Sequence, residues 1–301
     1  MPEPEYCPQA PAFTIGQRPS MIWSVICVSE FSISSTSRTS DGRSGWGMRL
    51  MTNTVERFSN RVENYIKYRP TYPPAVLELF KDKMGLTTAS VVADIGSGPG
   101  ISARQFLENG NTVYCVEPND AMRSAAEELL RGYAGFRSVK GDSENTTLPD
   151  ESIDFVTAAQ AFHWFKPEPT KAEFRRILRR GGFVALIWNL RQLDSTPFLI
   201  EYEQFILAHA NDYAAVRHDN ITEAEIADFF DGSFQRARFD NIQVFDLDGL
   251  KGRLFSSSYM PSENTDNGRA VEKDLHDLFT KYAENGKIEI FYDTNVFFSK
   301  W

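Results

Sequence analysis

Cysteine and long apolar runs are scarce in this sequence of 301 residues. The three cysteines, Cys7, Cys27 and Cys115, are odd in number and are not spaced like zinc ligands or a disulfide framework, so we expect no metal site and a reducing compartment. The longest apolar stretch near the start, residues 21–28, is too short to cross a bilayer and lacks the cationic region of a secretory signal. We therefore expect a cytoplasmic protein that has no membrane anchor.

Positive charge is also in short supply. Lysine and arginine total 32 against 41 aspartate and glutamate residues, which gives a formal net charge of -9. A surface with this balance repels phosphate backbones, so we do not expect a nucleic-acid partner. The hydrophobic content of 42% is ordinary for a globular protein and is sufficient for a sizeable core.

Residues 1–50 differ in character from the rest of the chain. Prolines recur between residues 2 and 19, a Ser/Thr-rich run covers 32–40, and three glycines follow without a persistent helical or strand period. We predict that this extension is disordered; the alternative is that the natural chain begins at Met48 or Met51. Residues 51–301 are predicted to form the folded domain.

From residue 90 onwards, short apolar segments alternate with helical ones. Strands are predicted at 90–95, 112–117, 136–140, 153–158 and 183–188, and helices between them at 101–108, 120–131 and 171–179. This alternation is typical of right-handed crossovers and of a parallel sheet covered on both faces. We therefore predict an α/β fold with a doubly wound, mostly parallel sheet.

The segments outside this alternation have weaker patterns. Two helices, at 56–68 and 74–84, are predicted before the first strand of the sheet. Helices at 198–210 and 222–230 follow the fifth strand, so residues 191–240 are predicted to form a helical lid insertion. The chain would end with a strand at 242–247, a helix at 268–284 and a long aromatic strand at 287–298, which is expected to run antiparallel at the edge region of the sheet.

The segment that runs from Asp94 to Gly100 carries the strongest functional signal. It follows a buried strand, and its alternate glycines allow the backbone to approach a ligand and turn into a helix. The dinucleotide pattern G-x-G-x-x-G fails because its sixth position is Ile101. The Asp94 carboxylate would repel a pyrophosphate but favour the ammonium and sulfonium groups of S-adenosylmethionine. The predicted cofactor residues here are Asp94, Gly96, Ser97, Gly98 and Gly100; an ordinary strand–helix turn is the alternative.

Polar residues after the next two strands support this interpretation. Glu117 ends the second strand, where a carboxylate can bind ribose hydroxyls. Asp142 and Ser143 follow the third strand, where they can serve the adenine amine and ring. Pro118 lies beside Glu117, and Met122 is predicted to pack on the adenine. The alternatives are a solvated strand-end Glu, a turn Asp and a core methionine.

Several motifs resemble those of the class I S-adenosylmethionine-dependent methyltransferases of the type-11 kind, and more narrowly their trans-aconitate methyltransferase-like branch. The motifs are the glycine loop, 57–59, 65–73, 116–119, 148–154, 159–165 and 256–261. The extension before Met48 matches none of them. The resemblance implies a seven-stranded Rossmann-like sheet whose last strand is antiparallel, with Asp94, Gly96, Gly98, Glu117 and Asp142 in the cofactor site. It also makes Tyr65 and Arg69 candidates to hold the cofactor's carboxylate; the alternative is that Tyr65 packs in the fold and Arg69 caps a helix end.

The loop 160–165 is expected to lie where the acceptor meets the methyl group. Gln160 is assigned to the cofactor, and His163 is a tentative catalytic base because its pKa class suits proton transfer near neutral pH; the alternative for His163 is a packed residue that orients the loop. The candidate substrate contacts are Trp164, Trp188, Asn189 and Tyr259. Weaker candidates for binding an anionic acceptor are Arg191, Arg217 and His218.

We therefore predict an enzyme, a monomer or homodimer, that transfers a methyl group from S-adenosylmethionine to a small organic molecule. A carboxylic acid is one expected acceptor. A quinone or isoprenoid-linked ring is the alternative acceptor for C- or O-methylation. Two further alternatives are a non-catalytic protein that binds the cofactor and a nucleotide-dependent oxidoreductase, which Asp94 disfavours.

Overall fold

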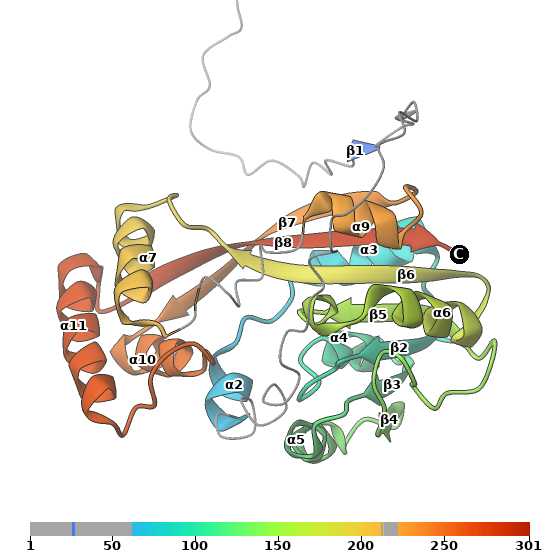
Figure 1. Ribbon diagram of the computed structural model, residues 1–301, viewed down its shortest axis with the longest axis horizontal. Helices are drawn as coiled ribbons and strands as arrows, with labels where there is room; N and C mark the ends of the chain where they lie inside the picture. The colour runs from blue at the N-terminus through green and yellow to red at the C-terminus, as the bar shows by residue number, and fades with distance from the viewer. Residues whose placement is uncertain (1–25, 28–61, 212, 214–221) are drawn as a thin grey trace, which may run out of the picture.

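The computed structural model describes residues 26–27, 62–211, 213 and 222–301 (Figure 1). Most of the predicted extension therefore lies outside the described residues, and so do two of the weaker site candidates, Arg217 and His218. Within the extension, the two-residue strand β1 (Ile26–Cys27) pairs antiparallel with β7 (Gln235–Phe245).

One sheet forms the centre of the molecule. Its strand order is β1-β7-β8-β6-β5-β2-β3-β4. Strands β2 (Val91–Ile95), β3 (Thr112–Val116), β4 (Phe136–Val139), β5 (Ile153–Ala159) and β6 (Leu178–Arg191) pair in parallel, whereas β8 (Ile288–Lys300) runs antiparallel between β6 and β7. Apart from the short β1, this is the predicted seven-stranded, mostly parallel sheet with an antiparallel last strand.

Helices cover both faces of the sheet, as predicted. On one face, α3 (Pro74–Met84), α4 (Ala103–Glu108) and α5 (Asp120–Leu130) contribute Phe80, Phe106 and Leu130 to a buried cluster. On the other face, α6 (Pro167–Ile177) and α9 (Glu223–Phe229) pack through Phe174 and Phe229. Burial of apolar side chains on both faces keeps the strands of the parallel region away from water.

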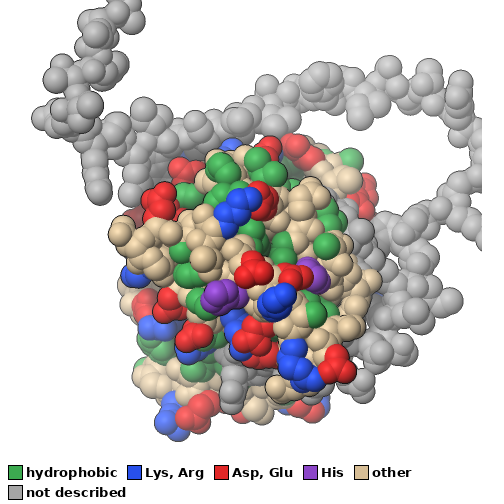
Figure 2. Space-filling view, turned by 90° about the vertical axis from the view of Figure 1, so that its left-hand side faces the viewer, with side chains coloured by type: hydrophobic (Ala, Val, Ile, Leu, Met, Phe, Trp, Pro, Cys, Tyr) green, Lys and Arg blue, Asp and Glu red, His purple; other side chains and the backbone are tan. Residues whose placement is uncertain are grey.

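A third buried cluster lies at the far ends of the long strands β6, β7 and β8, on the left of Figure 1. It joins α7 (Pro197–His209), α10 (Leu247–Phe255) and α11 (Asp266–Tyr282) to the first residues of β8. Acidic and basic side chains are interspersed over the outer surface of these helices (Figure 2), and Lys281 of α11 pairs with Glu201 of α7.

The predicted lid at 191–240 does not form one unit. Its first helix, α7, packs with α10 and α11, whereas α9 packs against α6 on the sheet, and residues 235–240 belong to β7. The reason is burial: the apolar residues of the two helices enter different clusters. The short helix α2 (Val62–Tyr68) reaches the same region from the N-terminal side and packs against α10.

Candidate functional site

The glycine loop begins where β2 ends. In the sheet, β2 lies between β3, the next strand along the chain, and β5, which follows β4 in the sequence. Such a switch point is where open α/β sheets bind ligands. Gly96, Gly98 and Gly100 have φ values of 66°, 54° and 86°, which L side chains rarely adopt. A Cβ on Gly96 would lie 2.7 Å from the Cβ of Ala161, whereas one on Gly98 would meet no atom within 4 Å. The backbone of Gly98 is therefore open to a ligand.

Asp94 lies behind this loop and is fully buried. The hydroxyl of Ser102 donates a hydrogen bond of 2.5 Å to one carboxylate oxygen, and the hydroxyl of Thr157 donates one of 2.8 Å to the other. Burial raises the pKa of Asp94 to about 6, although both hydroxyls act in the opposite direction. Asp94 therefore fixes the loop to α4 and β5 and places a carboxylate beneath the backbone of the loop.

Glu117 fastens the loop from the other side. Its carboxylate accepts hydrogen bonds from the backbone N–H groups of Gly98, at 2.9 Å, and Asn119, at 2.8 Å. Burial raises the pKa of Glu117, and these N–H groups limit the rise. Two buried carboxylates thus flank the glycine loop, which makes its surroundings favourable to a positively charged ligand.

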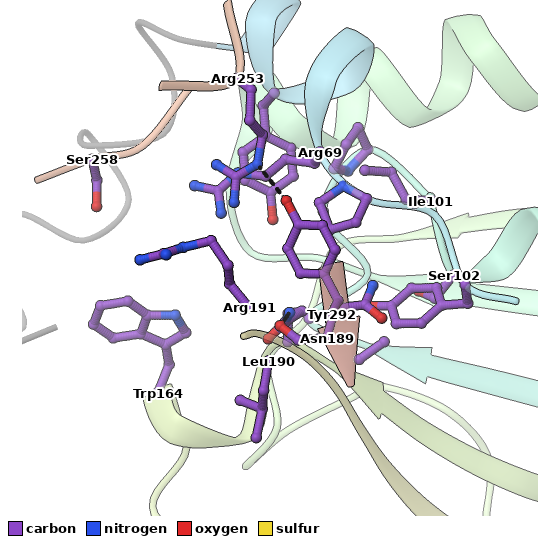
Figure 3. A pocket seen from close by; sticks show the side chains of 18 of the residues that line it. Arg69, Ile101, Ser102, Trp164, Asn189, Leu190, Arg191, Arg253, Ser258 and Tyr292 are labelled. Atoms are coloured by element: carbon purple, nitrogen blue, oxygen red, sulfur yellow. Dashed lines mark hydrogen bonds between the residues drawn. The ribbon is translucent and has the colours of Figure 1, made fainter. Parts of the chain in front are cut away.

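A cavity of about 160 Å³ opens beside the loop (Figure 3). Many of the predicted site residues line it: Tyr65, Arg69, Gly96, Ser97, Gly98, Gln160, Trp164, Asn189, Arg191 and Tyr259. The residues that sequence analysis did not single out include Tyr72, Tyr213, Arg253, Ser258 and Tyr292. The cavity is therefore bounded by the glycine loop on one side and by residues of α2, α10 and the end of β6 on the other.

Gln160 occupies a strained position at the end of β5. Its φ of 54° is unusual for a residue other than glycine, and such outliers cluster at functional sites. Its side-chain N–H donates to the carbonyl of Asn189 at 2.9 Å. Asn189 in turn donates to the carbonyl of Thr71 at 3.2 Å and accepts from Thr294. This network holds the segment after Arg69 against the ends of β5 and β6.

Other predicted residues lie away from the cavity wall. His163 and Trp164 share a 3-10 turn with ring centroids 4.8 Å apart, but only Trp164 lines the cavity. Trp188 is 3% exposed and packs edge-on against Phe162 and Phe297 in the core. This geometry does not support a substrate contact at Trp188, because residues of a strand alternate in direction and its neighbour Asn189 takes the cavity side.

The predicted adenosine residues lie along the edge of the sheet beyond Glu117. Asp142 is exposed and accepts hydrogen bonds from the backbone N–H groups of Glu144 and Asn145, and Ser143 is buried against Thr170. Pro118 is exposed and Met122 is 4% exposed. None of these four residues lines the cavity, so their contact with a cofactor stays a prediction.

Three arginines from distant parts of the sequence converge on the cavity. Arg69 follows α2, stacks on the ring of Tyr65 at 4.9 Å and donates to the carbonyl of Ser256 at 3.1 Å. Arg191 ends β6 and Arg253 lies in α10. Figure 3 shows the guanidinium groups of all three in the same part of the cavity.

A single carboxylate accompanies these arginines among the described residues. Glu203 of α7 pairs with Arg191, and Tyr213 bridges the two with its hydroxyl. Burial would lower the pKa of Arg191, but Tyr213, Tyr202 and Glu203 raise it above its ordinary value. Burial and the charge of Arg253 lower the pKa of Arg69. This side of the cavity therefore carries net positive charge.

Comparison with known proteins bears on the nature of this site. Residues 93–186 match the methyltransferase domain family. The chain is 29% identical over 150 residues to an uncharacterised methyltransferase of Schizosaccharomyces pombe, and 33% identical over 138 residues to one of Mycobacterium bovis. These matches cover 50% and 44% of this chain and 58% and 52% of the relatives. The chain thus spans little more than half the length of each of these relatives.

A solved structure from Anaeromyxobacter dehalogenans, named as a candidate type II methyltransferase, shares the fold with a TM-score of 0.57 and 20% identity, over 77% of this chain and 98% of that one. Residues 93–186 are thus a methyltransferase domain, and the solved structure shares its fold. The predictions of family, of fold class and of S-adenosylmethionine as cofactor are confirmed. The trans-aconitate-like branch stays a prediction.

The described residues also bear on other kinds of site. Among them, no group of three or more His, Cys, Asp or Glu side chains is arranged to hold a metal ion. None of the helices in the described ranges is both long and apolar enough to span a membrane.

Proposed function

We propose that this methyltransferase transfers the methyl group of S-adenosylmethionine to a small anionic acceptor, a carboxylic acid. One observation carries this proposal: the glycine loop, flanked by two buried carboxylates, and a cluster of three arginines open into the same cavity. The first suits a cationic methyl donor and the second an anionic acceptor.

The cofactor fits the residues on the loop side. Space above Gly98, the acidic pair Asp94 and Glu117, and the arginine and tyrosine at Arg69 and Tyr65 match its ribosyl sulfonium, ammonium and carboxylate groups. Gly96, Ser97, Gly100 and Gln160 would shape the wall, and Pro118, Met122, Asp142 and Ser143 would receive the adenosine. The bound cofactor supplies a methyl group that is already activated by the positive sulfur.

The cavity is smaller than the roughly 300 to 1,000 Å³ of typical ligand pockets. Its volume of about 160 Å³ suits the methionine end of the cofactor together with a small acceptor. The adenosine would then lie outside it, along the edge that runs from Glu117 to Asp142. This division agrees with the positions of the predicted adenosine residues beyond the cavity wall.

Because the methyl group is already activated, the residues of the protein mainly have to align the acceptor with it. A carboxylate acceptor attacks without losing a proton, so it needs no general base. Arg191 and Arg253 would hold the acceptor, and Trp164 would shield the reacting groups from water. Positioning the acceptor in line with the methyl group and the sulfur raises the rate of transfer. A direct catalytic role for His163 is not required, in accordance with its place off the cavity wall.

Titration calorimetry and methyl transfer test the proposal together. We expect the protein to bind S-adenosylhomocysteine, and to transfer tritiated methyl groups from S-adenosylmethionine to members of a panel of small carboxylic acids. Transfer to a quinol but to no acid would favour the alternative of ring methylation. Binding without transfer to any compound would favour a non-catalytic role, and the absence of binding would refute the proposal.

A further inference from the structure

The segment of residues 68–72 leads from the end of α2 towards α3 and contributes Arg69, Pro70 and Tyr72 to the wall of the cavity. Residues 70–73 belong to no helix or strand. Pro70 has a fixed φ and no N–H group to donate, so a ladder of backbone hydrogen bonds cannot hold this segment. Its position therefore depends on contacts with other parts of the chain.

Amide side chains of β6 and β7 supply these contacts. Asn241 of β7 and Asn189 of β6 donate to the carbonyl of Thr71, at 2.7 Å and 3.2 Å. Gln243, two residues along β7 and therefore on the same face of the strand, donates to the carbonyl of Tyr68 at 3.1 Å. Three amides thus bind the two ends of one short segment.

The orientation of each amide is determined by a donor to its oxygen. The oxygen of Gln243 accepts from Tyr292 at 2.9 Å, and that of Asn189 accepts from Thr294 at 2.5 Å. The oxygen of Asn241 accepts from the backbone N–H of the next residue at 2.9 Å. Each nitrogen therefore faces the segment.

We propose that Asn241 is a positioning residue for the cofactor, which acts through the carbonyl of Thr71. Neither Asn241 nor Gln243 lines the cavity, so neither is placed to contact a ligand there. Arg69 lies between the two carbonyls that these amides hold. This inference rests on the proposed function, which assigns the cofactor's carboxylate to Arg69 and Tyr65.

Holding the backbone on both sides of Arg69 prepares the site before the cofactor arrives. The guanidinium of Arg69 is bound separately, by the carbonyl of Ser256 at 3.1 Å. The amides therefore set the backbone of this residue, and Ser256 sets its side chain. A segment that is already in its binding position loses less conformational entropy when the ligand binds, which raises the affinity.

Asn241→Ala and Asn241→Leu test the proposal, and the second keeps a similar size without a donor. Gln235→Ala is the control, because Gln235 carries the same kind of side chain and is exposed at the start of the same strand. By titration calorimetry we expect the Kd for S-adenosylhomocysteine to rise about three- to tenfold in both Asn241 variants. It should stay within about twofold in the control.

A double-mutant cycle separates positioning from a general effect on the fold. Arg69→Gln alone should raise the Kd for S-adenosylhomocysteine at least about tenfold. In that background Asn241→Ala should add no more than about twofold, because the residue through which it acts has already been lost. A general structural role of Asn241 would raise the Kd by the same factor in both backgrounds.

Hydrogen exchange in the wild-type protein supplies a measurement that does not depend on how a variant folds. We expect S-adenosylhomocysteine to slow the exchange of the backbone N–H groups of residues 68–72 at least about fivefold. In the ligand-free state, Asn241→Ala should exchange faster than the wild-type protein at Thr71 and Tyr72, whereas the control should not.

Three results would overturn the inference. One is an unchanged Kd in both Asn241 variants, another is an equal loss in the two backgrounds of the cycle, and the third is wild-type exchange at 68–72 that the ligand does not slow. The proposed function fails in a different way. A wild-type protein that does not bind S-adenosylhomocysteine, or an Arg69→Gln variant that binds it as tightly as the wild-type protein, would refute the placement of the cofactor itself.

Discussion

The two walls of the cavity differ in charge and in how that charge is held. On the loop side, the charge comes from Asp94 and Glu117, which lie behind the glycine loop and do not line the cavity themselves. Their carboxylate oxygens accept hydrogen bonds from hydroxyl and backbone N–H groups. On the opposite side, Arg69, Arg191 and Arg253 donate to tyrosine, serine and carbonyl oxygens, with Glu203 as the one acidic partner among the described residues. These hydrogen bonds hold the side chains on both sides in place but leave the net charges unchanged. On the basic side, Arg69 Nε and Arg191 Nη1 are buried and have no acceptor among the described residues.

This difference indicates the charge that each ligand must carry. A buried charge that is hydrogen-bonded but not paired costs folding free energy, and a ligand of opposite charge recovers part of it. A cationic donor on the acidic wall and an anionic acceptor on the basic wall would recover both. The first three predictions below change the charge on one wall and leave the other as it is, and the fourth tests whether the reaction needs a base.

Asp94→Asn should have the largest effect. It removes the negative charge beneath the glycine loop but keeps the shape of the side chain, so we expect the thermal shift caused by S-adenosylhomocysteine to disappear and kcat/KM to fall about a hundredfold or more. Differential scanning fluorimetry and tritium transfer measure the two effects. Asp154→Asn is the control, since Asp154 binds Val91 and Arg179 at the starts of β2 and β6, the opposite end of the strands from the glycine loop. An unchanged shift in Asp94→Asn would remove Asp94 from the site.

The same variant should gain stability in the absence of ligand. The pKa of Asp94 rises from 3.8 to about 6 on folding, so the folded protein holds more protons than the unfolded chain between these values. The free energy of unfolding of the wild-type protein therefore falls as pH rises through this window, by up to about 3 kcal/mol. Urea unfolding at pH 5 and pH 7.5 should show Asp94→Asn exceeding the wild-type protein by more at the higher pH. A difference that does not change with pH would contradict the buried carboxylate.

A smaller effect is expected on the basic wall from Glu203→Gln. The change leaves Arg191 without its acidic partner and so increases the positive charge that faces the acceptor. We expect KM for an acidic acceptor to fall about two- to fivefold, while the protein loses about 1 to 3 kcal/mol of stability. Steady-state kinetics and urea unfolding measure both. Glu201→Gln on the same helix is the control, because Glu201 pairs with Lys281 outside the cavity; a higher KM in Glu203→Gln would count against an anionic acceptor.

His163→Gln should have the smallest effect. A carboxylate acceptor needs no base, so we expect kcat to fall by less than about tenfold, through disturbed packing of Trp164. The dependence of kcat on pH between 6 and 9 should keep its shape. A loss of about a thousandfold, together with a lost pH dependence, would show that His163 is a base and that the nucleophile is protonated.

The acidic wall was predictable from the sequence because its residues are contiguous or fall at the ends of consecutive strands. A glycine loop after an apolar strand needs little tertiary information, and Glu117 follows from strand order alone. The sheet was predictable for the same reason, since alternating apolar segments determine parallel pairing.

The basic wall depends on contacts that no local pattern reveals. Helix α10 contains Gly249 and Gly252, which disfavour helices, and the structure shows why Gly252 is there: a Cβ on it would lie 2.0 Å from the ring of Tyr68. That close approach brings Arg253 and Arg69 together. The sequence also does not reveal that the two helices predicted in the lid pack in different places: α7 packs with α10 and α11, and α9 packs against α6.

The most direct test of opposite charge on the two walls is a matched pair of acceptors. Tritium transfer from S-adenosylmethionine would be measured for a small carboxylic acid and for the alcohol with the same carbon skeleton, which keeps the size but lacks the charge. The account predicts a kcat/KM at least about tenfold higher for the acid. Equal rates for the two compounds, or faster transfer to the alcohol, would contradict it.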